Sequence, residues 1–338
     1  MEIKKISNQP TNISIWEKKA NHPLQSWYFG EVRRELGIEV LRLGEFKNNN
    51  LINTFQISLH PLIGGYKVGY LPRSTFPSLK VLRYLYHWGK KNKVVFIKIE
   101  PYEEQNNNSF SNKQTVNNFI LVKSSHPLFP QWTQMIDLQK SEEELFKNLH
   151  YKTRYNIRLA KKKNILIKQM DNDQGFEIFI KLYFKTCRRQ RYHGHNYRYH
   201  RSIWKNFQKK IAHILIAYYR DLPLAAYQLW LYKKRLYYVY GGSSDQYRNF
   251  MASNLLMWEA IRFGKLNEAK IFDLWGSLPS DYPPNHPWAG FTRFKQGYGG
   301  KFVQFVGSYD LIINPFLYNL YSFIYPLRQF FLKFKFLL

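Results

Sequence analysis

The sequence predicts a mixed α/β protein built from two similar halves. Helix-like and strand-like segments alternate along the chain, and hairpin signals interrupt them, which favours mixed sheets over a strict parallel repeat. The same rough order recurs in both halves: a helix pair, a strand meander, a buried helix and a further strand. Because 338 residues are enough for two domains of ordinary size, we expect domains at residues 1–140 and 141–307.

The first half is defined by capping serines and β-branched runs. Ser26 and Ser78 are placed to cap helices over residues 26–37 and 78–91. The Asn-, Gln- and Ser-rich segment before the last strand of this half is expected to be a loop. Alternating or β-branched patterns predict strands over residues 38–46, 51–59, 93–100 and 133–138.

The second half opens at a capping box, in which Ser141 is matched by Glu144 three residues later. Further helices are expected over residues 151–163, 175–189, 200–210, 254–263 and 288–297. Strands are expected over residues 165–169, 211–219, 222–232, 235–241, 271–275 and 302–306. Ser253 is placed to cap the helix that Gly264 should end, and this helix is apolar almost all round and therefore expected to be buried.

The charge balance favours a polyanionic partner. Lysine and arginine number 51 against 23 aspartate and glutamate, giving a formal net charge of +28 and a pI near 9.9. Such a field attracts nucleic acid, anionic lipid or phosphorylated substrates. An AT-rich genome would explain the lysines without any functional demand. It would not explain the scarcity of acids, because Asp and Glu codons are equally AT-compatible.

Composition and motifs exclude several classes of protein. An apolar fraction of 45% excludes disorder for most of the chain, and a single cysteine, Cys187, excludes a disulfide framework or a multi-thiolate zinc site. A nucleotide P-loop, a dinucleotide fingerprint, a serine nucleophile elbow and an HExxH site are all missing. His193, His195 and His200 lack a carboxylate companion in a basic segment, so we expect surface histidines and no metal site.

The chain ends show no strong targeting signal. The N-terminus lacks the apolar region of a signal peptide and no run of 18 apolar residues occurs, so we expect a cytoplasmic protein without a spanning helix. Residues 314–338 come closest to a membrane-active segment, because they are rich in Phe, Tyr and Leu but carry Pro326, Arg328, Lys333 and Lys335. They could dock on the protein core or lie on a membrane surface, at the inner face.

Two basic clusters are candidates for phosphate binding. On a helix, Arg154, Arg158, Lys161 and Lys162 fall on one stripe, which could be a ridge for RNA phosphates or a solvated face. Like charges one turn apart oppose helix formation, so an anion would relieve the stripe. Three arginines within residues 188–191 suit bidentate phosphate recognition or interaction with a helix C-terminus.

The third cluster joins Asp273-Leu-Trp-Gly276, a proline-rich loop and Gly290-Phe-Thr-Arg-Phe294-Lys295-Gln-Gly297-Tyr-Gly299. A strand that ends in Asp and Gly, followed by an aromatic–lysine pair between glycines, is more typical of a pocket rim than of packing. Here the chain resembles the Fem family (FemA, FemB and FemX), the aminoacyltransferases that build peptidoglycan interpeptide bridges. Matching blocks occur in order at Leu24–Gly37, Lys152–Ala160, Thr186–Arg189, Tyr240–Ser243, Asp273–Gly276, Gly290–Gly299 and Val306–Asp310.

The resemblance covers about residues 20–320 and implies a fold. Family members have two tandem domains similar to the GNAT acyltransferases, and their C-terminal tail, here residues 308–338, returns to the first domain. No long heptad insert interrupts the second half, so the chain looks like the short members that lack a coiled-coil arm.

The resemblance also implies an activity and its residues. An aminoacyl group moves from aminoacyl-tRNA to the stem-peptide amine of a UDP-linked or lipid-linked peptidoglycan precursor, without metal or nucleotide cofactor. Lys295, beside Phe294, matches the family's catalytic pair, and its ammonium would stabilise the oxyanion. Arg33 and Arg189 correspond to the family's precursor-binding cations, with Arg34 as an alternative to Arg33, and Tyr240 is a pocket candidate.

Two other functions stay open from the residues. An acyl-CoA N-acyltransferase of the same fold would need a glycine-containing pyrophosphate loop, and residues 243–252 contain no glycine. A non-catalytic binder of RNA or of a membrane surface would show salt-dependent binding without turnover.

Overall fold

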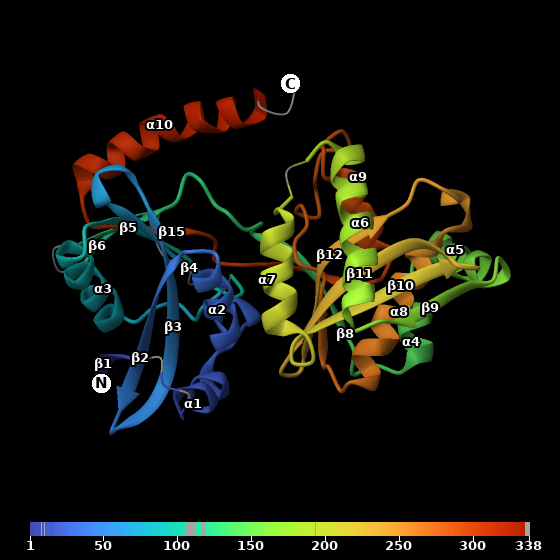
Figure 1. Cartoon of the computed structure of the whole chain (residues 1–338), viewed down its shortest axis with the longest axis horizontal. Helices are drawn as coiled ribbons and strands as arrows, with labels where there is room; N and C mark the ends of the chain where they lie inside the picture. The colour runs from blue at the N-terminus through green and yellow to red at the C-terminus, as the bar shows by residue number, and fades with distance from the viewer. Residues whose placement is uncertain (8, 10, 106–112, 117–118, 193, 335–338) are drawn as a thin grey trace. The chain divides into compact units, whose positions relative to one another are not determined.

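The protein consists of two compact units, each built on one mixed sheet (Figure 1). The computed structural model describes residues 1–7, 9, 11–105, 113–116, 119–192 and 194–334. The first unit combines Met1–Phe129 with Phe305–Leu338, and the second is Pro130–Gln304. The first boundary therefore falls at Phe129 rather than at residue 140, because the strand over residues 132–137 pairs within the second unit.

The first unit contains an eight-stranded sheet in the order β1-β2-β3-β4-β5-β15-β7-β6, in which β4 and β5 are parallel. Its strands are β1 (Glu2–Lys5), β2 (Glu39–Lys47), β3 (Asn50–Pro61), β4 (Lys67–Pro72), β5 (Val94–Glu100), β6 (Lys113–Val116), β7 (Phe119–Lys123) and β15 (Tyr309–Ile312). Its helices are α1 (Thr11–Lys19), η1 (Pro23–Gln25), α2 (Trp27–Glu35), η2 (Ile63–Gly65), α3 (Leu79–Lys91) and α10 (Pro315–Phe334).

Strand β15 joins the end of the chain to the first unit. It lies between β5 and β7 and pairs antiparallel with both. A buried ion pair between Lys98 Nζ and Asp310 Oδ1, 2.9 Å apart, fixes this insertion. Ser124 and Tyr318 donate further hydrogen bonds to the same carboxylate. The carboxylate is thus fully satisfied inside the sheet layer.

The second unit contains a seven-stranded sheet in the order β14-β8-β13-β12-β11-β10-β9. Its strands are β8 (Trp132–Asp137), β9 (Ile165–Gln169), β10 (Ala212–Tyr219), β11 (Leu222–Tyr232), β12 (Arg235–Ser243), β13 (Ile271–Asp273) and β14 (Lys301–Gln304). Its helices are α4 (Glu142–Lys147), α5 (Tyr151–Lys162), α6 (Asp173–Gln190), α7 (Tyr197–Phe207), η3 (Arg248–Phe250), α8 (Ala252–Leu266) and α9 (Ala289–Gln296).

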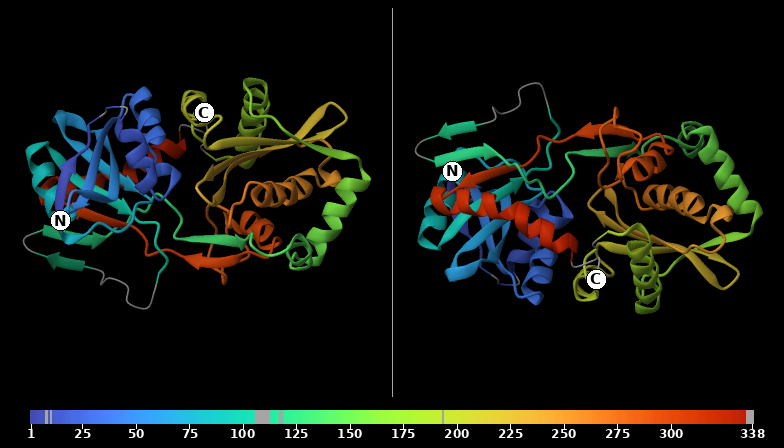
Figure 2. Two further views of the ribbon diagram at one scale, coloured as in Figure 1. Left: turned by 90° about the horizontal axis from the view of Figure 1, so that it is seen from below. Right: turned by 90° about the horizontal axis from the view of Figure 1, so that it is seen from above.

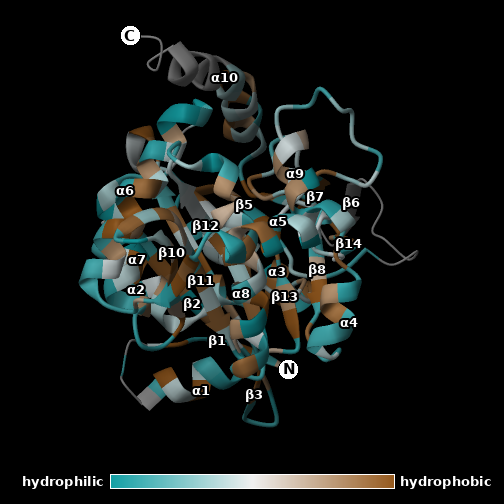
Figure 3. Cartoon of the chain, turned by 90° about the vertical axis from the view of Figure 1, so that its right-hand side faces the viewer, coloured by the Kyte–Doolittle hydropathy of each residue, from teal (hydrophilic) through white to brown (hydrophobic). Residues whose placement is uncertain are grey.

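Helices α6 and α8 cover opposite faces of the second sheet (Figure 2, left). Helices α4 and α6 carry both hydrophilic and hydrophobic residues, as Figure 3 shows, which is typical of helices that cover a core. Helix α8 is buried over most of its length, as its composition predicts. Within the described residues, no helix has the length and apolarity needed to cross a bilayer.

Local signals predicted most helix starts correctly. Ser26, Ser78 and the Ser141 capping box are confirmed as N-caps. The cap at Ser253 is wrong, because α8 begins at Ala252 after Met251, which has a φ of +55°. Gly264 does not end α8 either, because the helix continues to Leu266. A Cβ on Gly264 would lie 2.7 Å from the Leu138 side chain, so glycine at this position allows Leu138 to pack closely against the helix.

Candidate active site

Lys295 lies near the end of α9 and its side chain points inward. The residue is fully buried, and its Nζ donates hydrogen bonds to the carbonyl oxygens of Leu274 and Gly276, the latter at 2.5 Å. Two of the three ammonium hydrogens are thereby used, and the third has no acceptor among the described residues. The sequence pattern suggested a pocket rim, whereas the structure places this lysine in the interior of the second unit.

The two carbonyl groups that hold Lys295 belong to the turn after β13. Trp275 and Gly276 have φ values of +62° and +111°, and the second is a conformation that glycine adopts readily. Asp273 fixes the turn, because its Oδ1 accepts hydrogen bonds from Trp275 N at 2.8 Å and from Thr133 Oγ1 at 2.6 Å. The block Asp273–Gly276 therefore forms the turn whose carbonyl groups bind the lysine ammonium.

Aromatic rings surround the rest of the ammonium group. The ring centroids of Phe291 and Tyr238 lie 3.7 and 5.7 Å from Nζ, within cation–π range. Phe291 is 44% exposed, so its ring contacts both the ammonium and solvent. Phe294, the expected partner of Lys295, packs instead on Tyr298, with ring centroids 5.3 Å apart. Sequence analysis missed Phe291, although its position one helical turn before Lys295 is a usable signal.

Burial changes the acid–base behaviour of this site. Loss of hydration lowers the pKa of Lys295 well below its usual range, and the charge of Asp273 opposes that shift only in part. Burial also raises the pKa of the phenols of Tyr227, Tyr238 and Tyr298, which therefore stay neutral. Lys295 consequently loses its proton at a lower pH than an exposed lysine would.

Two glycines bring the end of α9 against the junction of α4 and α5. A Cβ on Gly297 would lie 2.4 Å from Thr153 Oγ1, and one on Gly299 would lie 2.8 Å from Asn148 O. The backbone N–H of His150 donates to the Gly297 carbonyl at 3.0 Å. These glycines therefore set the distance between the helix that carries Lys295 and helix α5.

Arg189 is positioned where the C-terminal end of α6 packs on β12. Its Nη1 and Nη2 donate to the carbonyl and hydroxyl oxygens of Ser243, each at 2.9 Å. Ser243 N donates to Thr186 Oγ1 at 2.8 Å. A Cβ on Gly242 would lie 2.4 Å from the carbonyl carbon of Leu182, so the close packing needs glycine. The Nε of Arg189 is buried and finds no hydrogen-bond acceptor among the described residues.

Tyr240 lies on β12, the strand that ends at Ser243, and belongs to an aromatic cluster. Its hydroxyl donates to the Tyr199 hydroxyl at 3.4 Å, and its ring centroid lies 4.8 Å from that of His200. Burial, together with the charge of His195, lowers the pKa of His200 to about 3. The expected surface location is confirmed for the exposed His195 and is wrong for His200, which is fully buried. The third histidine of this prediction, His193, lies outside the described residues.

No metal centre was found in the part of the chain that the structure describes. It contains no group of three or more His, Cys, Asp or Glu side chains that could hold an ion.

Arg33 lies on α2 of the first unit. Its guanidinium stacks over the ring of Phe29 with a separation of 4.7 Å. Burial, with the charge of Arg33, lowers the pKa of His60 to about 4. Arg34, the alternative to Arg33, forms an ion pair with Glu31 at 3.3 Å. Arg34 therefore forms an ion pair with a carboxylate, whereas Arg33 forms a cation–π contact.

The rest of the N-terminal block has a structural role. The Gln25 side chain donates to the carbonyl of Gln56 and accepts from its N–H. Arg42, fully buried, donates to Gln56 Oε1 at 2.9 Å and to the Trp27 carbonyl at 2.8 Å. A Cβ on Gly30 would lie 2.2 Å from Arg42 Nη2. This network holds α2 on the sheet, and Trp27 is buried in the core.

The basic stripe of α5 is only partly free for a ligand. Arg154 Nη1 donates to the carbonyls of Lys147 and Leu149, so it caps the end of α4. Arg158 lies over the ring of Phe146 at 5.5 Å. Lys161 and Lys162 are exposed, as are Arg158 and the rings of Tyr151 and Tyr155. The predicted ridge therefore loses Arg154 and keeps its other three cations.

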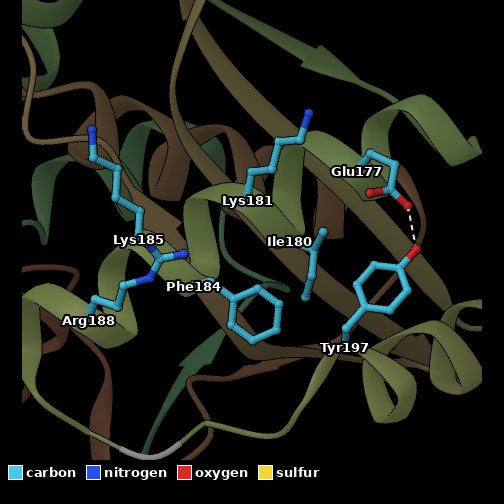
Figure 4. A pocket seen from close by; sticks show the side chains of 7 residues that line it. All are labelled: Glu177, Ile180, Lys181, Phe184, Lys185, Arg188 and Tyr197. Carbon is cyan, nitrogen blue, oxygen red and sulfur yellow. Dashed lines mark hydrogen bonds between the residues drawn. The ribbon is translucent and has the colours of Figure 1, made fainter.

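A shallow groove of about 460 Å³ runs along the outer face of α6 and the start of α7 (Figure 4). Lys181, Lys185 and Arg188 follow each other at helical spacing along it, and Lys185 pairs with Asp245. At one end, the Tyr197 hydroxyl donates to Glu177 Oε1 at 2.7 Å. The lining residues of the groove include none of the residues that contact Lys295.

Comparison with known proteins identifies the family of the chain and relatives of part of it. The model of the FemAB family matches residues 14–231 and 218–326. "Aminoacyltransferase FemA" of Staphylococcus epidermidis is 27% identical over 109 residues, covering 32% of this chain and 26% of that protein. "Lipid II:glycine glycyltransferase" of Staphylococcus haemolyticus is 25% identical over 127 residues, covering 37% and 30%. The chain thus matches less than a third of the length of either relative.

The fold has known counterparts. The crystal structure of FemX superposes with a TM-score of 0.79 at 17% identity, covering 95% of this chain and 99% of that one. A tandem GNAT protein from the clavulanic acid biosynthesis pathway superposes with a TM-score of 0.53 at 9% identity, covering 93% and 99%. The two units are therefore tandem GNAT-like domains, as predicted.

Proposed function

The chain belongs to the FemAB family, and on that premise we propose that it is an aminoacyltransferase acting on a peptidoglycan precursor. It moves an aminoacyl group from aminoacyl-tRNA to a stem-peptide amine. The names of the relatives, an aminoacyltransferase and a glycyltransferase of lipid II, support the reaction and a lipid-linked acceptor. The observation that carries the proposal is the buried ammonium of Lys295, seated on two backbone carbonyls with one hydrogen unused.

The reaction is aminolysis of an ester. A neutral amine attacks the ester carbonyl carbon, the carbonyl oxygen becomes an oxyanion, and the C–O bond to the ribose then breaks. The amine's proton passes to the departing ribose oxygen. The ammonium of Lys295 donates a hydrogen bond to the oxyanion through its third hydrogen. The site has a low dielectric constant, in which this stabilisation of the oxyanion is strongest. Because the ester is already activated, the transfer needs neither nucleotide nor metal.

Access to Lys295 requires a side-chain movement. The ammonium has no exposed surface, and the half-exposed ring of Phe291 lies 3.7 Å from it. Rotation of this ring would open a path to Nζ and leave the contacts with Leu274 and Gly276 in place. The closed state keeps water away from the lysine, which strengthens its interaction with developing charge.

The remaining candidates divide between the two substrates. Arg189, held by Ser243 with its Nε unused, suits a phosphate of the precursor, with Tyr240 beside it as a ring for stacking. Arg33 is the corresponding cation of the first unit. The exposed cations Arg158, Lys161 and Lys162, next to the exposed rings of α5, suit the RNA backbone and its unpaired bases.

The experiment is a transfer assay with the full chain. A set of radiolabelled aminoacyl-tRNAs and acetyl-CoA would be offered as donors, and the UDP-linked and the lipid-linked precursor as acceptors, with mass spectrometry of the products. We expect transfer from RNA esters only, and undiminished transfer when EDTA is added to the charged donor. Transfer from acetyl-CoA, or RNA binding without any product, would overturn the proposal.

A further inference from the structure

Helix α10 carries an outward-facing apolar stripe. Phe316, Leu320, Phe323 and Ile324 are 76%, 46%, 75% and 47% exposed. Their spacing of four, seven and eight residues from the first places them on one face of the helix. A helix on a water-soluble protein normally turns this face toward the core, so the orientation of α10 is reversed.

The opposite face fixes that orientation. The Tyr318 hydroxyl donates to Asp310 Oδ2 at 3.0 Å, and the rings of Tyr318 and Tyr321 pack on Phe96 with centroids 5.2 and 5.1 Å away. One turn further, Tyr325 stacks on His126 at 4.3 Å. The tyrosines thus anchor α10 to the sheet of the first unit, and the stripe cannot turn inward without breaking these contacts.

The charge of the segment indicates what covers the stripe. Residues 314–338 contain no acidic residue, and their charged residues are Arg328, Lys333 and Lys335, in a chain of net charge +28. Apolar rings next to cations, without acids, complement the surface of an anionic bilayer, where rings enter the acyl boundary and cations meet the phosphates. A second copy of so basic a segment would be repelled.

We propose that α10 docks the protein on an anionic membrane surface by shallow insertion of Phe316, Leu320, Phe323 and Ile324. The helix lies in the plane of the interface and does not span it, in agreement with its Pro326 and with the lack of a spanning helix among the described residues. The inference rests on the geometry of α10 and does not depend on the reaction at Lys295. It adds a site of attachment that would bring the active site close to lipid-linked acceptors.

The test must separate insertion from plain adsorption, because any protein of charge +28 binds anionic vesicles at low salt. Vesicle flotation at about 0.15 M and about 0.5 M salt would compare phosphatidylcholine with phosphatidylcholine containing phosphatidylglycerol. The variant is Phe316→Ser/Phe323→Ser. The control is Ile63→Ser/Leu266→Ser, which removes two apolar side chains that are 98% and 84% exposed outside α10.

We expect binding to the anionic vesicles that the α10 variant weakens about tenfold or more at both salt concentrations, while the control binds like the native chain. Equal binding by the α10 variant and the native chain would overturn the proposal, as would equal binding to neutral vesicles. A dimer that forms in solution and is lost in the α10 variant would also overturn it, because the stripe would then be an interface between copies.

A depth-sensitive probe gives a second readout that does not depend on affinity. Phe323→Cys can be labelled with a solvatochromic dye, because Cys187, the only native thiol, is buried. Anionic vesicles should shift the emission of the dye to the blue, whereas the same dye at Leu266→Cys should not respond. An unshifted emission at position 323 would contradict insertion. Transfer to the UDP-linked precursor should be unchanged throughout, so failure here leaves the proposed reaction untouched.

Discussion

At the residue scale, Lys295 differs by its partners from two other buried cations, Lys98 and Arg42. Lys98 is paired with Asp310 at 2.9 Å and Arg42 with Glu31 at 2.8 Å, so each of these charges is compensated by a carboxylate. The hydrogen bonds of the Lys295 ammonium go to backbone carbonyls, which are dipoles and leave most of the positive charge uncompensated. A buried positive charge without a carboxylate partner destabilises the folded state. The same charge can stabilise the negative charge that develops on an oxyanion.

The cost should be visible in the pH dependence of stability. The pKa of Lys295 is lower in the folded chain than in the unfolded one, so between these two values the unfolded chain binds more protons. Stability therefore rises with pH across that window, by at most about 1.4 kcal/mol per pH unit. Urea unfolding from pH 7 to 10 should show this rise in the native chain and in Lys301→Met, an exposed control, but not in Lys295→Met. Parallel curves would mean that Lys295 is not perturbed.

Phe291 should control access to the same amine. Removing its ring in Phe291→Ala exposes Nζ to water and returns the pKa of Lys295 toward its usual range. Reductive methylation followed by peptide mass spectrometry should leave Lys295 unmodified in the native chain and modify it in the variant. Trp288→Ala, at a residue that is 47% exposed at the start of the same helix, is the control and should keep the protection. Equal protection in Phe291→Ala would contradict the role of the ring as a cover.

At the scale of elements, local chemistry could be predicted and tertiary packing could not. Three capping serines were recognised because a cap depends on residues within one turn. The start of α8 was misplaced because Met251 sets it through a left-handed backbone that propensity does not reveal. Likewise the blocks around Arg154 and Gly297 suggested ligand binding, but the first partly caps α4 and the second fits α9 against α5.

The site was predicted in its residues more than in its geometry. Lys295, Arg189 and Asp273 were all singled out from sequence blocks. In the structure, Lys295 binds to the turn that Asp273 stabilises. Phe294 was named from family resemblance, whereas the ring that contacts the Lys295 ammonium is that of Phe291, one helical turn earlier. The burial of His200 was missed because its basic, histidine-rich segment was interpreted as surface, whereas Tyr199 and Ile203 beside it are buried as well.

The packing of α6 on β12 depends on Gly242. In Gly242→Ala the new Cβ would lie 2.4 Å from the backbone of Leu182, so helix and strand must separate, at a cost of about 1–3 kcal/mol. The arginine held by Ser243 would move with them. Gly290→Ala is the matched control, because nothing lies within 4 Å of its new Cβ. Chemical unfolding should show the loss only for Gly242→Ala; equal stability of the two variants would contradict the packing described.

At the scale of the whole molecule, the first unit is discontinuous in sequence and the second is continuous. The second unit is one segment whose ends lie on paired strands, with Trp132 opposite Gln304. The first unit needs β15 from the end of the chain to fill the space between β5 and β7. The return of the tail followed from family resemblance, whereas no local signal marked the strand that carries it.

These topologies predict different behaviour of fragments. Residues 130–304 should fold alone with a cooperative thermal transition, because all strands of their sheet are present. Residues 1–129 should not, because the central strand β15 and the partner of Lys98 are absent. Adding residues 305–338 as a separate peptide should restore structure to the latter, as judged by circular dichroism. A cooperative transition of residues 1–129 alone would contradict the central place of β15.

The most direct measurement is the single-turnover rate of aminoacyl transfer from charged RNA. Lys295→Met should lower this rate about a hundredfold or more without changing RNA affinity, and the native rate should fall as pH rises through the lowered pKa of Lys295. Lys301→Met should transfer at the native rate. If Lys295→Met transfers within a few-fold of the native rate, the buried ammonium does not stabilise the transition state.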